Sequence, residues 1–324
     1  MRLEFQVPVF KGGYYWRDMR DISEKVVMAS GAGGNAVCRV LLPILEAPDE
    51  WFGLSLNTMP DNLFRTFAAL CEHKEKVELE AAIADFAGNY GMLKASGRYK
   101  AKLVTREYGG DLYDGETLLT WVQASLDMHR AVELLDSIMR VEDGLGGTQK
   151  HSEALSLLER RIKWETSKQG RNFVRYENTD SHPWVSPMGI VDNIAGGDIH
   201  PEILSHKDEV LLPARVYCAD LASRNLAGNM DFRIEYHPDS ANETSLCHVY
   251  APRGLFGFMW KQFADVLTGE VHLTECQNPK CNEWFKVGLY AKKIHSKYCS
   301  IECKNAANNA KRPTTRNERL RNLE

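Results

Sequence analysis

The sequence predicts an α+β protein with a mainly helical body, a minor share of strand, and a small C-terminal module built around cysteines. Two observations support this class. Long segments of residues 1–270 place apolar side chains at the three- and four-residue spacing of amphipathic helices, with short alternating runs between them. Close to the C-terminus, two cysteine pairs stand 17 residues apart. The four residues are Cys276, Cys281, Cys299 and Cys303.

Length and composition are those of a soluble globular protein. The chain has 324 residues, of which 44% are hydrophobic and 26% charged, and this length suits about two domains. No apolar run approaches the roughly 20 residues of a membrane span. The N-terminus lacks the basic and apolar pattern of a signal peptide. We therefore expect a cytoplasmic protein without a membrane partner, whose eight cysteines stay reduced.

Charge is spread unevenly along the chain. The formal net charge is −4, yet the segment from Lys286 to Glu324 contains ten Lys and Arg residues against three acidic residues. That segment carries +7, so the remainder carries −11. A basic module on an acidic body favours a polyanionic partner for the C-terminal part.

The first third of the body mixes helices with short strand-like runs. The apolar residues between 35 and 45 predict a helix that follows a Gly-Gly turn. Residues 76–90 show a helical pattern that ends at Gly91, which suits a C-cap. The apolar face of this helix is expected to comprise Val77, Ile83, Phe86 and Ala87.

The rest of the body is predicted to contain four more helices and one pair of strands. Residues 168–209 are rich in Gly, Pro, Asn, Asp and His, which predicts a long irregular connection. The strand pair is joined by the turn-forming residues 238–242. The helices are expected at 116–140, 151–164, 212–226 and 253–267, and the strands at 232–237 and 245–250.

The cysteine spacing C-x4-C-x17-C-x3-C is one that four thiolates on a single Zn²⁺ require. Asn278-Pro279 supplies a turn inside the first pair, and Ser300 can cap a helix that contains Cys303. A unit of about 45 residues has too small a core to fold alone, so the metal would supply most of its stability. We expect one structural zinc ion with no open ligand position.

The order of elements in this module is that of a treble-clef finger. A knuckle at the first cysteine pair leads to a strand at 284–287, and a return segment leads to a helix that Pro313 ends. The chain thus divides into the body, a zinc finger at 271–312 and a flexible basic tail at 313–324. His272 and His295 are weaker ligand candidates, and four reduced core cysteines without a metal are the alternative.

The helix that follows the cysteines has the composition of a nucleic-acid reader. Asparagine is a poor helix former, yet three asparagines lie here among basic residues. Asn can pair with an adenine edge, while Lys and Arg bind phosphate or guanine. Alternatively, this is a solvated polar helix whose lysines offset the charge of four thiolates. The candidate DNA-binding residues are Lys304, Asn305, Asn308, Lys311, Arg312 and Arg316.

The run from Cys276 to Phe285, followed by residues 298–300 and 303–305, resembles the CGNR-type zinc finger. The similarity extends over about residues 253–312, although Lys304 and Ala306 replace the Gly and Arg of the family signature. In that family a helical ligand-sensing-like domain, called ABATE, precedes the finger, and the proteins are regarded as transcription regulators. The resemblance implies a regulator that binds duplex DNA. Its body would bind a small-molecule effector or form a homodimer.

Two other functions stay open at this point. The finger could be a structural clip in a protein-interaction or assembly component, because a fold does not fix a function. The body could instead hold an enzyme site, for which residues 170–210 offer His182, Asp198, His200 and Glu202 without any spacing that makes them converge. The outline of a dinucleotide-binding loop at 31–36 lacks the alternating strands and helices that would follow it.

Overall fold

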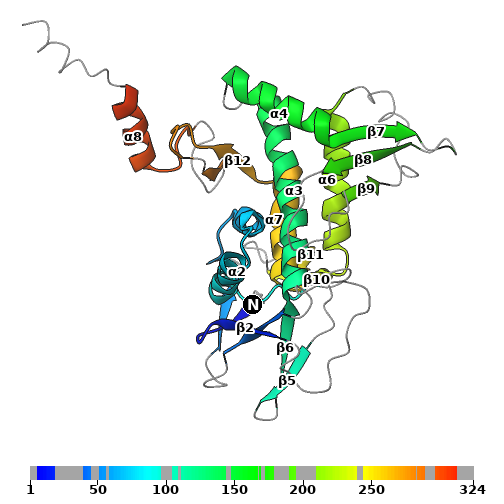
Figure 1. The fold of residues 1–324 in the computed structure, drawn as a ribbon, viewed down its shortest axis with the longest axis vertical. Coiled ribbons are helices and arrows are strands. Elements are labelled where there is room, and N and C mark those ends of the chain that lie inside the picture. Colours follow the sequence, from blue (N-terminus) through cyan, green and yellow to red (C-terminus); the bar gives the residue numbers. More distant parts are fainter. Residues whose placement is uncertain are drawn as a thin grey trace, which may run out of the picture.

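The protein folds into a central group of helices with small antiparallel sheets around it, as the computed structural model in Figure 1 shows. The α+β class is confirmed, with more strand than the sequence suggested. The structure describes residues 6–18, 39–44, 51–55, 58–95, 104–108, 111–143, 147–166, 168, 172–178, 190–194, 209–238, 244–281, 283–288 and 296–311.

Two antiparallel sheets form the N-terminal part of the body. One pairs β1 with β4, and the other has the strand order β2-β3-β6-β5. The strands are β1 (Gln6–Phe10), β2 (Tyr14–Asp18), β3 (Arg39–Pro43), β4 (Trp51–Ser55), β5 (Val104–Tyr108) and β6 (Asp111–Thr117). The helix predicted between residues 35 and 45 is therefore wrong. Its apolar core Val40-Leu41-Leu42 is a strand, at most 1% exposed, and a fully buried strand has no alternation to distinguish it from a helix.

The long helix α3 (Leu118–Asp143) lies at the centre of the fold, and helices from both halves of the chain pack on it. Aromatic rings fill the space between them: Trp121 lies 6.1 Å from both Phe67 and Phe86, measured between ring centroids. Trp121 and Trp260 are fully buried. The packed helices are α1 (Leu63–Ala69), the 3-10 turn η4 (Leu70–Glu72), α4 (Gly147–Arg161), α6 (Leu211–Leu226) and α7 (Leu255–Leu267).

Several helices predicted from periodicity are confirmed. Helix α2 (Lys76–Tyr90) ends at Gly91, whose φ of 93° is the left-handed backbone conformation that glycine permits. The buried face of α2 differs in one position, because Val77 is 79% exposed while Leu79 is fully buried. Helices α6 and α7 match their predicted ranges closely, and the apolar face of α7 is buried.

The connection predicted as irregular contains regular structure. A three-stranded antiparallel sheet is formed by β7 (Ile162–Thr166), β8 (Asn172–Asn178) and β9 (Ile190–Ile194). The predicted helix at 151–164 accordingly begins and ends earlier, as α4, and Trp164 belongs to β7. Val174 and Tyr176 alternate in β8 and are fully buried, and Tyr176 stacks on Tyr217 of α6 with centroids 5.0 Å apart. The alternation of Val174 and Tyr176 with polar residues is a strand pattern, but the Gly, Pro, Asn, Asp and His content of residues 168–209 led to the irregular prediction.

The predicted strand pair is confirmed as a long hairpin of β10 (Met230–Pro238) and β11 (Thr244–Pro252). The hairpin leads into α7, and the turn before β10 approaches this helix closely. The carbonyl of Asn229 accepts a hydrogen bond from the Arg253 N–H at 2.9 Å. This contact fixes where α7 begins, and α7 then carries the chain to the cysteine module.

A buried carboxylate, Glu116, ties the start of α3 to the chain that follows α2. It accepts hydrogen bonds from the backbone N–H groups of Leu93 at 3.0 Å and Lys94 at 2.7 Å. Lys94 has a positive φ of 49°, and the Leu93 carbonyl accepts from Phe256 N–H at the start of α7. Burial raises the pKa of Glu116 to about 7, although both N–H donors act in the opposite direction.

This pKa predicts a measurable pH dependence of stability. The pKa rises from 4.5 to about 7 on folding, so the unfolded chain releases this proton first as pH increases. The stabilisation is complete below about pH 4.5 and is lost by about pH 7, a change on the order of 3 kcal/mol. Thermal melting of the wild type and Glu116→Gln between pH 5 and pH 7.5 measures it. We expect the wild type to lose stability relative to the variant, and a constant difference between them would contradict the assignment.

Candidate metal centre

The first two cysteines lie in the turn of a short hairpin formed by β12 (His272–Glu275) and β13 (Trp284–Val287). Cys276 N–H donates to the carbonyl of Glu283 at 2.9 Å, which continues the strand pairing into the turn. Cys281 N–H donates to the carbonyl of Asn278 at 2.8 Å, so the turn expected at Asn278-Pro279 is confirmed. Both thiols are thereby held on the same end of the hairpin.

The second cysteine pair lies at the start of α8 (Ile301–Lys311). Ser300 caps this helix as predicted, because its Oγ accepts a hydrogen bond from Cys303 N–H at 3.1 Å. A backbone hydrogen bond of 2.8 Å from Gln277 N–H to the Lys297 carbonyl joins the hairpin turn to the segment before the helix. This bond brings the two cysteine pairs together.

The four thiols converge on one point. Their sulfur atoms all lie within 4.8 Å of one another, and none forms a disulfide. The sulfurs of Cys281 and Cys299 are 3.7 Å apart, and those of Cys299 and Cys303 are 3.4 Å apart. Four sulfurs at 2.3 Å from a tetrahedral ion would be separated by about 3.8 Å. The described residues therefore fit a metal ion bound by four sulfurs.

The thiols differ in how readily they lose a proton. Hydrogen bonds from the Asn278 side chain, and then from Cys299 and Ser300, lower the pKa of Cys303 to about 7. Desolvation raises the pKa of Cys299. Because the thiolate is the form that binds a metal, Cys303 is the first ligand available at neutral pH.

The other described cysteines are separate from this centre. Cys71 and Cys218 are buried, and burial raises the pKa of each thiol to about 12, as expected for small apolar core residues. Cys38 lies outside the described residues, and Cys247 belongs to β11, where its backbone pairs with Glu235. Within the described chain, the group that could hold a metal consists of the four predicted cysteines, and it does not include the exposed His272. His295 also lies outside the described residues.

Helix α8 presents a polar surface to solvent. Lys304, Asn305 and Asn308 are exposed, and at 100° per residue they lie within an arc of about 100°. Ala307, which is 2% exposed, lies on the cysteine side of the helix. In Figure 1, α8 stands away from the central helices α3 and α7. Lys311 is the last residue of α8, while Arg312 and Arg316 lie outside the described residues.

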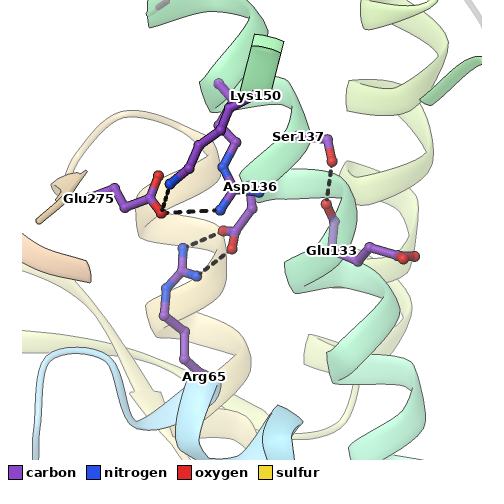
Figure 2. Close-up of polar contacts among 7 residues, drawn as sticks. Arg65, Glu133, Asp136, Ser137, Lys150 and Glu275 are labelled. Carbon is purple, nitrogen blue, oxygen red and sulfur yellow. Dashed lines mark hydrogen bonds and ion pairs between the residues drawn. The ribbon is translucent and has the colours of Figure 1, made fainter. Parts of the chain in front are cut away.

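The hairpin of the metal centre is packed against the body, a contact that sequence reasoning missed. Leu273 and Trp284 belong to the main core and are 4% and 6% exposed. The guanidinium of Arg65 lies 4.5 Å from the Trp284 ring centroid and forms an ion pair with Asp136 at 2.6 Å. Figure 2 shows Arg65 of α1 facing Asp136 of α3 on the body side of the junction.

An ion-pair group crosses this junction. Glu275 lies directly before Cys276 and is buried, and one of its oxygens accepts from Lys150 at 2.8 Å and from Arg140 at 3.4 Å. Figure 2 shows Lys150 reaching this carboxylate. Burial opposes its charged form, but Lys150 and Arg140 hold the pKa of Glu275 below its ordinary value. Sequence offered no signal for this contact, because Arg140 precedes Glu275 by 135 residues.

No protein-family model, curated protein or solved structure matches this chain. Among the described residues, no helix is both long enough and apolar enough to cross a lipid bilayer.

Proposed function

We propose that the protein is a DNA-binding transcription regulator in which a structural zinc finger holds α8 ready to bind duplex DNA. The observation that supports this proposal best is the two-sided character of α8. Its inner side is fixed by Cys303 and Ala307, and its outer side exposes Lys304, Asn305 and Asn308. An asparagine-rich helix held rigidly with its polar side in solvent suits base contacts better than packing against a partner helix.

Zinc is the metal that suits the four-sulfur site. Tetrahedral sites with four thiolates select zinc or iron–sulfur chemistry, and a single ion with four protein ligands has no open position for a substrate. The knuckle, hairpin and helix follow one another as in a treble-clef finger, which agrees with the resemblance to CGNR-type fingers. The ion would hold the two cysteine pairs together, and the exposed side chains of α8 would make the contacts with DNA.

A helix of this size fits the major groove of B-DNA, where Asn can pair bidentately with adenine. Lys304 would contact phosphate or guanine, and the basic residues that follow α8 would contact the backbone. Such contacts release counterions, so the affinity should fall steeply as salt increases. The body carries a net negative charge, which would repel DNA and so favour its binding at the finger end of the molecule.

The test replaces Lys304, Asn305 and Asn308 with alanine together and measures duplex binding by fluorescence anisotropy. We expect the affinity to fall more than tenfold, because each good base contact contributes about 1–3 kcal/mol. Lys304→Ala alone should reduce the slope of log affinity against log salt by about 1. The matched control is Lys163→Ala, an exposed lysine of β7. Unchanged affinity in the triple variant, or wild-type binding that is insensitive to salt, would refute DNA recognition by α8.

A second candidate function is supported by the packed hairpin. Because Glu275 and Trp284 join the metal centre to the body, the finger could act as a clip in an assembly component. In that case the triple alanine variant would keep its DNA affinity and lose a protein partner in a pull-down. The four residues considered for an enzyme site, His182, Asp198, His200 and Glu202, lie outside the described part of the chain.

A further inference from the structure

A polar cavity of about 830 Å³ lies at the junction between the metal-centre hairpin and the body. Its walls come from α1, η4, α3 and α4 on the body and from β12, β13 and Glu283 on the hairpin. Figure 2 shows several of its residues pointing toward one another across this junction. The volume lies within the range of about 300–1,000 Å³ that is typical of small-molecule sites.

The part of the cavity around Glu275 carries an excess of positive charge. Arg65 and Asp136 neutralise one another, whereas Arg140 and Lys150 share the single carboxylate of Glu275. The Nε of Arg140 is buried and has no hydrogen-bond acceptor among the described residues. The side chain of Lys150 is 43% exposed, so its ammonium can be reached from solvent. These groups suit a carboxylate, which can accept from both cations.

The exposed lining of the cavity has the opposite charge. Glu72, Glu153 and Glu283 line the cavity and are exposed, and they belong to η4, α4 and the segment before β13. Among the described residues, Glu72 and Glu283 form no ion pair through their carboxylates. A ligand that enters with an ammonium group would meet these carboxylates at the rim.

We propose that this cavity binds a small zwitterion of the amino-acid class, either a free amino acid or a di- or tripeptide. Its carboxylate would bind Arg140 and Lys150, and its ammonium would lie among the rim carboxylates. The Trp284 ring, Ala154 and Leu157 provide an apolar wall for a side chain. A lining with both cations and free carboxylates matches a molecule that carries both charges, and neither charge alone matches the whole site.

This inference does not depend on DNA binding by α8. It does connect the cavity to the metal centre, because Arg140 and Lys150 also bind Glu275, the residue before Cys276. A bound carboxylate would share these two cations with the hairpin. The ligand would therefore contact both sides of the junction.

The test is isothermal titration calorimetry of the full chain, without DNA, against the twenty free amino acids and against Ala-Ala and Ala-Ala-Ala. Acetate and ethylammonium, each at the same concentration, serve as probes with one charge. Lys150→Met removes the accessible cation, and Lys163→Met removes an exposed lysine far from the cavity. Glu72→Gln with Glu283→Gln removes two rim charges without removing a cation.

We expect at least one amino acid or peptide to bind, with no heat from acetate or ethylammonium. Lys150→Met should weaken binding at least tenfold, the double rim variant should weaken it several-fold, and Lys163→Met should leave it unchanged. The peptides distinguish a free amino acid from a peptide ligand. Absence of binding by the whole panel, equal binding of acetate, or unchanged affinity in Lys150→Met would each overturn the proposal.

Discussion

Removal of the metal is expected to unfold the C-terminal finger and leave the helical body folded. None of the described residues from 296 to 311 belongs to the main core, so little apolar burial would hold α8 in place once the sulfurs are released. Metal binding contributes roughly 10–16 kcal/mol in isolated zinc fingers, far more than the few contacts around Ala307 can replace. The body retains the core around Trp121 and Trp260, which contains no metal ligand.

Two measurements on a chelated sample check this expectation. Elemental analysis should give one zinc per chain before chelation, and a thiol reagent should then find four additional reactive cysteines. Trypsin should cleave at Lys280, Lys297 and Lys304, while α3 and α7 remain intact. Cys299→Ser should lower the zinc content, and the matched control Cys218→Ser, which alters a buried cysteine outside the centre, should not. A chelated protein with α8 still resistant to trypsin would show that the metal does not stabilise the finger.

Sequence predicted the metal centre because its determinants are local. The turn at Asn278-Pro279, the cap at Ser300 and the strand at 284–287 each depend on a few consecutive residues, and all three are confirmed. One further contact, the hydrogen bond from Gln277 N–H to the Lys297 carbonyl, brings the two cysteine pairs together. The sequence predicted that they lie close together, because four ligands of one ion must surround it. The same local logic predicted α2, α6 and α7, whose apolar faces repeat at helical spacing.

The predictions that were wrong or missing have a common cause, which is contact between residues that are distant in the sequence. Val40 to Leu42 form a strand because β2 pairs with one edge of β3 and β6 with the other, and both partners are distant in sequence. Tyr176 is buried because it stacks on Tyr217, which an isolated reading of the polar segment cannot reveal. The junction at Glu275 and Trp284 depends likewise on α1, α3 and α4. Such contacts require the tertiary arrangement, which overrides local pattern.

The start of α7 is another place where a distant contact decides which residue is allowed. A Cβ atom at Gly257 would lie 2.2 Å from the backbone carbonyl oxygen of Asn229, whereas a Cβ at Gly88 of α2 would meet no atom within 4 Å. Both glycines lie inside helices, so their intrinsic helix propensities are equal. A comparison of the two positions therefore distinguishes two effects of glycine: the space that its missing Cβ leaves for a neighbour, and its low helix propensity.

Gly257→Ala is expected to destabilise the protein by about 3 kcal/mol, because either α7 or the turn at Asn229 must move to relieve the overlap. Gly88→Ala is expected to stabilise it by about 0.5–1 kcal/mol, since alanine lowers the entropy cost of the helix. In thermal melting, the first change corresponds to a loss of roughly 5–10 °C and the second to a small gain. Equal melting temperatures for both variants would show that α7 does not approach Asn229 this closely. Because α7 leads directly into the hairpin that supports the metal centre, Gly257→Ala should also weaken zinc retention, whereas Gly88→Ala should not.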